Sequence, residues 1–177
     1  ATDGGFPSGH TAEAGRNAIA MAYLVPQRYQ ELIARGLDLG DSRIIAGMHS
    51  AMDVIGGRLQ SIAADVANLN AMTVEQRKEA YLQAQTQLMK ETNSSTFESF
   101  YSLAKTPYDA NDRFADLEKL KQQVNHWMTY GFNQIGDKTK IATVPKGAEV
   151  LLETRLPYLT ADQHRVVLKS TALASGY

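Results

Sequence analysis

Arg43, His49 and Asp53 are three side chains whose types and spacing suit phosphoryl transfer. His49 and Asp53 lie four positions apart, so on a helix the carboxylate can reach the imidazole ring. A carboxylate bound to one ring nitrogen fixes the tautomer and leaves the other nitrogen free as a base or nucleophile. Arg43 adds a planar set of N–H donors that suits phosphate oxygens. The stretch therefore predicts attack by a histidine on a phosphate-like group.

A second stretch, Pro7-Ser8-Gly9-His10, lies upstream and contributes another histidine. Its glycine-containing turn comes just before a predicted helix, where backbone N–H groups can form an anion site. His49 alone would more often be a structural residue, but the combination of both stretches favours a phosphate or vanadate site. His126 and His164 have no such neighbours in the sequence, and we expect them to be structural.

The elements that must position these residues are helices, because apolar residues recur along most of the chain with helical spacing. We expect helices that begin near Thr11, Pro26, Ser42, Thr73, Ser95, Asp109 and Thr160. Gly36 and Gly40 are expected to end the second helix. The third, capped by Asp41 or Ser42, is then expected to carry all three motif side chains on one continuous helix. Capping-box patterns start at Thr73 and Thr160.

The stretch from residue 131 to 147 is expected to be irregular, because it is rich in Gly and Pro. No stretch indicates a sheet, an internal repeat or a low-complexity tract. The sequence thus predicts an all-α helical bundle. Residues 1–72 are expected to form the catalytic core helices with both motifs. Residues 73–177 would add further helices to the same domain, with a possible appended subregion after about residue 131.

Composition limits the possible partners. The 177 residues are enough for one domain with a full core. A net charge of −1 gives no electrostatic reason to expect nucleic acid or an anionic membrane as a partner. The chain has no cysteine, which excludes disulfides and thiolate metal sites. The longest apolar run, residues 18–25, is far shorter than the roughly 20 residues that span a bilayer.

The two stretches resemble the second and third signature motifs of the type 2 phosphatidic acid phosphatase superfamily. That superfamily includes the bacterial class A non-specific acid phosphatases and the vanadium haloperoxidases. The similarity to class A-like acid phosphatases runs from about Phe6 to Arg58 and includes Leu39-Gly40 before the Ser-Arg pair. The resemblance implies a helical bundle of the acid phosphatase and vanadium haloperoxidase type. It also implies a soluble, metal-independent phosphomonoesterase that is periplasmic or secreted in bacteria.

The resemblance implies a catalytic role for three matching residues. His49 would attack phosphorus and form a phosphohistidine intermediate, with Asp53 orienting its ring. His10 would protonate the leaving alkoxide and then activate water. One histidine must therefore start neutral and the other protonated, which predicts a bell-shaped pH–rate profile with an acidic optimum.

The resemblance also implies a phosphate-binding set. Arg43, the Ser8 hydroxyl and the Gly9 N–H would hold the non-bridging oxygens of a small phosphate ester, with phosphate or vanadate as alternative ligands. No cofactor or metal is expected for a phosphatase. Vanadate would be the cofactor if the chain were instead a vanadium haloperoxidase, because vanadate adopts the geometry of the phosphoryl transition state.

The first motif of the superfamily, a lysine followed after six residues by Arg-Pro, is absent from this sequence. We therefore expect the chain to be a piece of a longer protein, with that motif on an upstream segment or a second chain. The chain alone would then be inactive or only weakly active, and a non-catalytic fragment of a larger superfamily member is the remaining alternative. A homo-oligomer is also compatible with the pattern.

Overall fold

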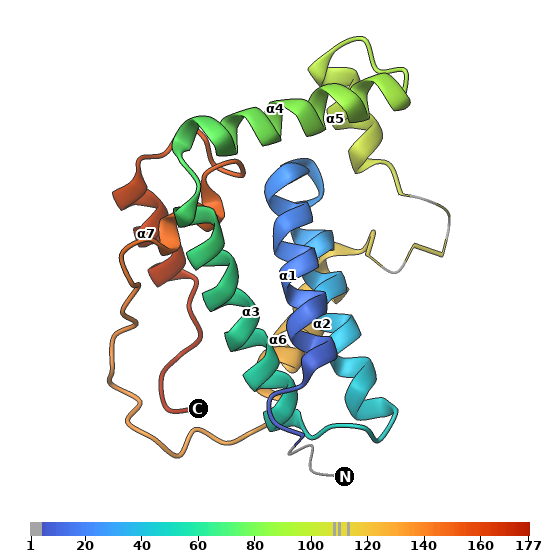
Figure 1. The fold of residues 1–177 in the computed structure, drawn as a ribbon. Helices are drawn as coiled ribbons and strands as arrows, with labels where there is room; N and C mark the ends of the chain where they lie inside the picture. Colours follow the sequence, from blue (N-terminus) through green and yellow to red (C-terminus); the bar gives the residue numbers. More distant parts are fainter. Residues whose placement is uncertain (1–4, 108, 110, 113) are drawn as a thin grey trace.

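The computed structural model describes residues 5–107, 109, 111–112 and 114–177, and it consists of helices joined by turns and irregular segments (Figure 1). Its α-helices are α1 (Gly9–Leu24), α2 (Tyr29–Ile45), α3 (Ala51–Ala71), α4 (Val74–Glu91), α5 (Phe97–Lys105), α6 (Leu117–Thr129) and α7 (Ala161–Ser170). Two 3₁₀ helices, η1 (Pro26–Arg28) and η2 (Ala148–Leu152), complete the set. No strand occurs among the described residues, so the predicted all-α class is confirmed.

α1, α2 and α3 pack against one another at the centre of the molecule (Figure 1). Glycines mark their closest approaches. A Cβ on Gly36 of α2 would lie 2.6 Å from the Ala18 Cβ, and a Cβ on Gly57 of α3 would lie 2.7 Å from the Ser8 carbonyl oxygen. Any larger side chain at these positions would push the helices apart. Gly36 therefore serves packing, and the prediction that it helps to end the second helix was wrong: α2 continues to Ile45.

The prediction of a single helix for the Arg43–Asp53 stretch was also wrong, because α2 ends and α3 begins within it. α2 ends at Ile45, and the chain turns at Gly47, whose φ is +67°. Ser50 then caps α3: its hydroxyl accepts from the Asp53 N–H at 3.2 Å, and the Asp53 carboxylate accepts from the Ser50 N–H at 2.8 Å. A glycine after one helix and a reciprocal cap before the next are stronger local signals than apolar periodicity.

α3 runs without a break through Gly56 and Gly57, and the next residue anchors a later helix. The buried Arg58 guanidinium donates from Nη1 to the Trp127 carbonyl at 2.6 Å and lies 5.6 Å from the centre of the Tyr130 ring. A cation is favoured at the carboxyl end of a helix, where backbone carbonyls are left unpaired. Arg58 thus holds the end of α6 against α3.

α4 lies across the end of α1 that is opposite to its N-terminus, with α5 beyond it (Figure 1). A polar cluster fixes α4 in this place. Arg77 of α4 donates to both carboxylate oxygens of Glu153, at 2.8 and 3.1 Å, and the Tyr23 hydroxyl of α1 donates to the same carboxylate at 2.5 Å. Such a paired and hydrogen-bonded cluster is the form in which charges are tolerated in an interior.

The capping boxes predicted at Thr73 and Thr160 are confirmed, since both start helices with the reciprocal hydrogen bonds expected. The helix start predicted near Asp109 was wrong. α6 begins at Leu117, where the Asp116 side chain accepts from two backbone N–H groups at 3.1 Å. Asp109 instead accepts from the Asn111 N–H at 2.7 Å in a local turn, and residues 110 and 113 of that prediction lie outside the described residues.

In the described part of the chain, each helix is too short or too polar to span a bilayer.

The connection between α3 and α4 falls at residues 72–73, where the predicted division of the domain lies. The separate roles assigned to residues 1–72 and 73–177 stay a prediction.

Candidate functional site

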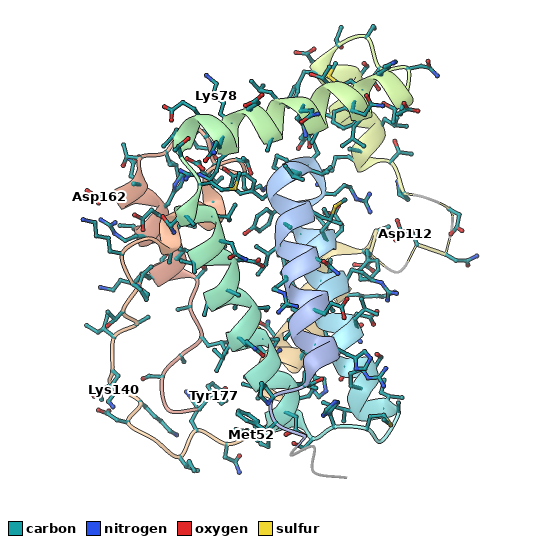
Figure 2. The ribbon with its side chains drawn as sticks, in the orientation of Figure 1. Met52, Lys78, Asp112, Lys140, Asp162 and Tyr177 are labelled. Atoms are coloured by element: carbon teal, nitrogen blue, oxygen red, sulfur yellow. The ribbon has the colours of Figure 1, made fainter. Side chains whose placement is uncertain are left out.

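The two sequence stretches meet at one end of the three central helices, the lower end in Figure 1. α1 and α3 begin at this end and α2 ends there. The Ser8 N–H donates to the Asp53 carbonyl at 2.9 Å, which ties the turn before α1 to the first turn of α3. Met52, next to Asp53, marks the same end in Figure 2. Two segments far apart in the sequence are therefore held side by side by a backbone hydrogen bond.

His49 lies in the turn between α2 and α3. Its N–H donates to the Arg43 carbonyl at 3.2 Å, and its Nδ1 lies 3.6 Å from Asp53 Oδ2. That distance suits an ion pair with a protonated ring, but it is too long for a hydrogen bond. The structure thus brings the histidine and the carboxylate together, although not through the helix that the sequence predicted. The ring-orienting role of Asp53 stays a prediction.

Hydrogen bonds favour the charged form of the Asp53 carboxylate. The Ser50 backbone N–H is the largest cause of its lowered pKa, burial acts in the opposite direction, and the Ser50 hydroxyl and His49 lower the pKa further. The same carboxylate therefore caps α3 and faces the imidazole. Because its pKa is lowered, the carboxylate presents its negative charge to the His49 ring under conditions where an ordinary carboxylate starts to protonate.

Arg43 is placed in the last turn of α2. Its Nε and the Nδ1 of His49 are both buried and have no hydrogen-bond partner among the described residues. A buried polar atom that is left unpaired costs about 1–3 kcal/mol, so such atoms normally have partners. An unpaired N–H donor of this kind is suited to an oxyanion, and the phosphate-binding role of Arg43 stays a prediction.

Ser8 is fully buried and caps α1. Its Oγ accepts from the Thr11 N–H at 3.3 Å and from the Thr11 hydroxyl at 3.0 Å, and its carbonyl accepts from the Ala12 N–H at 3.0 Å. Of the first-turn donors, those of Gly9 and His10 remain open to an anion, and both residues are exposed. The phosphate-binding role of the Gly9 N–H stays a prediction. The oxygen-binding role of the Ser8 hydroxyl stays a prediction beside its observed role as a cap.

Sequence reasoning missed Ser50, whose cap positions Asp53, and Thr11, whose side chain fixes Ser8. The Ser-x-x-Asp spacing of residues 50–53 was the available signal for the cap. Thr11 follows Ser8 by three positions, the spacing at which a helix cap accepts from the first turn, so its contact was also a local signal. His164, predicted to be structural, is buried in α7 with its Nε2 at 2.8 Å from the Leu156 carbonyl oxygen.

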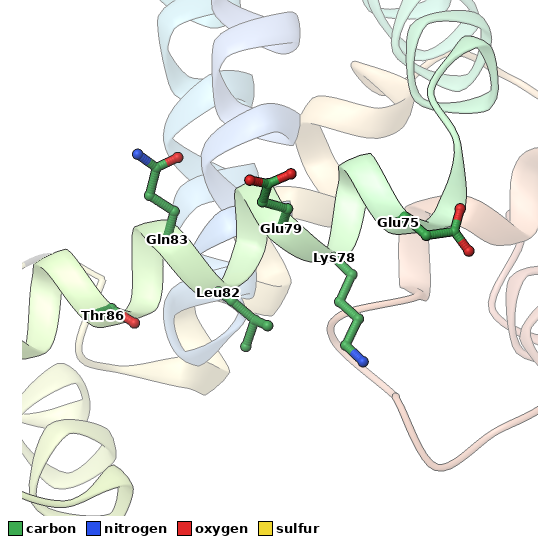
Figure 3. A pocket seen from close by; sticks show the side chains of 6 residues that line it. All are labelled: Glu75, Lys78, Glu79, Leu82, Gln83 and Thr86. Carbon is green, nitrogen blue, oxygen red and sulfur yellow. The ribbon is translucent and has the colours of Figure 1, made fainter.

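Other concave surfaces lie away from these residues. One shallow hollow is lined by side chains that all come from α4, as Figure 3 shows, and another lies between residues 141–144 and α7. Within the described ranges, no group of three or more His, Asp or Glu side chains is arranged to hold a metal ion. The end of the central helices is therefore the place where residues suited to phosphate chemistry gather.

This end of the helical fold therefore holds both sequence stretches side by side, and comparison with known proteins shows what they are similar to. Residues 1–77 match the PAP2 superfamily, so the resemblance carried by the two motifs is confirmed for this part of the chain. No solved structure gives a significant match.

Two curated relatives, both bacterial, show what this part of the chain is similar to. The chain is 46% identical over 56 residues to a non-specific acid phosphatase of Salmonella typhi, a match that covers 32% of this chain and 22% of the relative. It is 36% identical over 69 residues to a non-specific acid phosphatase of Providencia stuartii, which covers 39% of this chain and 27% of the relative. The match thus spans about a quarter of the length of these relatives.

Proposed function

We propose that this chain carries the catalytic end of an acid phosphatase-like enzyme, which hydrolyses phosphoric monoesters through a phosphohistidine and without a metal. The observation that supports this most is the bond from the Ser8 N–H to the Asp53 carbonyl, because it unites the two motifs at one end of the helices. The unpaired donor of Arg43 at that end adds support. The relatives named as acid phosphatases support the class of reaction.

In the proposed first step, His49 attacks phosphorus through Nε2, because its Nδ1 faces Asp53. The bond between phosphorus and the ester oxygen breaks, and that oxygen takes a proton from His10. In the second step, His10 accepts a proton from water, whose oxygen attacks phosphorus. The bond from phosphorus to His49 then breaks and inorganic phosphate leaves, so each histidine returns to its starting state.

Stabilisation of charge would come from donors fixed before the reaction. Arg43, the Gly9 N–H and the Ser8 hydroxyl would bind the equatorial oxygens, on which negative charge is concentrated during phosphoryl transfer. The N-termini of α1 and α3 both lie at this end, and their dipoles favour an anion there. The proposed substrate is a small phosphate ester, and the proposed location is periplasmic or secreted in bacteria.

The pH dependence of hydrolysis tests the two-histidine mechanism. With a simple aryl phosphate as substrate, we expect a bell-shaped profile with an acidic optimum between about pH 4 and 7, because His49 must be neutral and His10 protonated. A strong chelator is expected to leave the rate unchanged. A profile that is flat from acidic to alkaline pH would contradict the mechanism, and oxidation of halide after addition of vanadate would favour the haloperoxidase alternative instead.

A further inference from the structure

Thr11 of α1 lies between α2 and α3, at a point where all three central helices are in contact. It is 1% exposed. A Cβ on Gly40 of α2 would lie 2.9 Å from the Thr11 Cγ2, and a Cβ on Gly57 of α3 would lie 2.8 Å from the Thr11 Cβ. Close-packed interiors do not accommodate contacts this short, so both glycines are needed to make room for Thr11. One side chain of α1 thus limits how near α2 and α3 can come.

These contacts lie about one helical turn from proposed site residues. Gly40 is three positions before Arg43 on α2, and Gly57 is four positions after Asp53 on α3. A shift of either helix at its contact with Thr11 would therefore move Arg43 or Asp53 as well. The position of Thr11 between the two helices is tied to the distance between these two side chains.

The Thr11 hydroxyl fixes the turn before α1. It donates to the Ser8 Oγ at 3.0 Å, and the Thr11 N–H donates to the same atom at 3.3 Å. The Ser8 N–H in turn donates to the Asp53 carbonyl at 2.9 Å. Thr11 therefore contacts all three segments that carry proposed site residues: the turn before α1 through its hydroxyl, α2 through its methyl group and α3 through its Cβ.

We propose that Thr11 is a positioning residue of the candidate site, which sets the distances between the ends of α1, α2 and α3. This rests on the proposed function. Because Thr11 is buried, it acts through Ser8, Arg43 and Asp53 and does not touch the phosphate. Phosphoryl transfer depends mainly on donors held in place, and a displacement of about 1 Å can cost about a hundredfold in rate. A change of one methyl group at Thr11 should therefore alter phosphate binding as well as stability.

Moving one methyl group from Thr11 to Gly40 tests the proposal in the full chain. Gly40→Ala adds a methyl group against the Thr11 Cγ2, and Thr11→Ser removes that Cγ2. Calorimetry with inorganic phosphate gives the affinity of each variant. We expect Gly40→Ala to bind about tenfold more weakly than the parent, and Thr11→Ser about threefold more weakly. The double variant has room for the added methyl group, so it should bind at least about fivefold more tightly than Gly40→Ala.

Thr11→Val tests the hydroxyl separately from the shape of the side chain. Valine keeps the size of threonine but removes the O–H donor to the Ser8 Oγ, so we expect phosphate to bind about threefold more weakly or less tightly still. Val150→Ala is the control for stability, because Val150 is 5% exposed in η2, which contains no proposed site residue. It should lower the urea midpoint of unfolding and leave phosphate affinity within about twofold of the parent.

Two results would overturn the proposal while the proposed function stands. One is that Thr11→Ser and Thr11→Val both bind phosphate as tightly as the parent does. The other is that the double variant binds phosphate no more tightly than Gly40→Ala. The two single Thr11 variants decide the question if Gly40→Ala does not fold. A parent chain that binds no phosphate would overturn the proposed function, and the role of Thr11 with it.

Discussion

Replacing His49 by alanine is expected to lower kcat/KM for an aryl phosphate by about a thousandfold or more, because the variant lacks the atom that attacks phosphorus. His49 lies in the turn between α2 and α3, with its Nδ1 facing the Asp53 carboxylate, so no other imidazole can take its place without rebuilding that turn. The measurement is initial-rate kinetics at the acidic optimum, with substrate concentrations on both sides of KM.

His126→Ala is the control for this substitution. His126 is exposed in the last turn of α6, and its ring packs edge-on against Tyr130 with centroids 5.9 Å apart. Its loss should change kcat/KM by less than about threefold, because it touches none of the proposed site residues. A His49→Ala chain that keeps more than about a tenth of the parent rate would show that another group is the nucleophile.

Asp65→Asn is expected to stabilise the protein at neutral pH, a direction opposite to that of most substitutions. Asp65 lies on α3, is 8% exposed, and its Oδ2 is buried without a hydrogen-bond partner among the described residues. Burial raises the pKa of Asp65 from 3.8 to about 6, and the charge of Arg16 on α1 opposes part of that rise. Asparagine keeps the shape of the side chain and removes the charge that burial disfavours.

The pH dependence of this stabilisation follows from the direction in which the pKa of Asp65 is shifted. The folded protein binds the Asp65 proton more tightly than the unfolded chain, so the cost of ionising Asp65 grows as pH rises from about 4 to above 6. The free energy of unfolding should exceed that of the parent at about pH 7.5, and by clearly more than it does at about pH 4.5. Urea unfolding at both pH values gives the two differences.

Asp162→Asn supplies the matched control, since its carboxylate is 83% exposed and lies in the first turn of α7. Removing its charge should change the free energy of unfolding by less than about 0.5 kcal/mol at either pH. If Asp65→Asn lowers stability at neutral pH, or changes it equally at both pH values, the carboxylate of Asp65 has a polar partner that stabilises its charge.

The elements with strong local signals could be predicted from the sequence. Thr73 and Thr160 each begin a capping box, and both helices start there in the structure. One failure, at Gly36, comes from packing between elements distant in sequence. In the sequence, Gly36 indicates a helix end. In the structure it permits the close approach of α2 to α1, a contact that no local pattern predicts. The start of α6 was missed for a different, local reason: the cap of this helix is Asp116 and not Asp109, seven positions earlier.

For the candidate site, the sequence predicted which residues belong together but not how they are held. Arg43, His49 and Asp53 were expected on one helix and are instead placed by the end of α2, a turn, and the start of α3. They stay close because the Ser50 cap fixes Asp53, and because the Arg43 carbonyl accepts from the His49 N–H. The burial of Ser8 under its own helix turn could not be predicted, because it depends on the contact with Gly57.

That contact also links the fold to the proposed chemistry. The absence of a side chain at Gly57 lets α3 approach the Ser8 carbonyl, and the Ser8 N–H in turn binds the Asp53 carbonyl. The N-termini of α1 and α3 are therefore placed at one end by a close helix contact and one hydrogen bond. If the proposed anion site lies there, its backbone donors are positioned before any ligand arrives, which is what charge stabilisation in phosphoryl transfer requires.

Trapping the covalent intermediate tests the central claim most directly. The chain is mixed with a phosphate ester labelled on phosphorus, denatured rapidly at alkaline pH, where phosphohistidine persists, and cleaved into peptides. The account predicts label on the peptide that contains His49, loss of that label on acid treatment, and none in the His49→Ala variant. Turnover with no label on that peptide, or with label on the peptide that contains His10 instead, would contradict it.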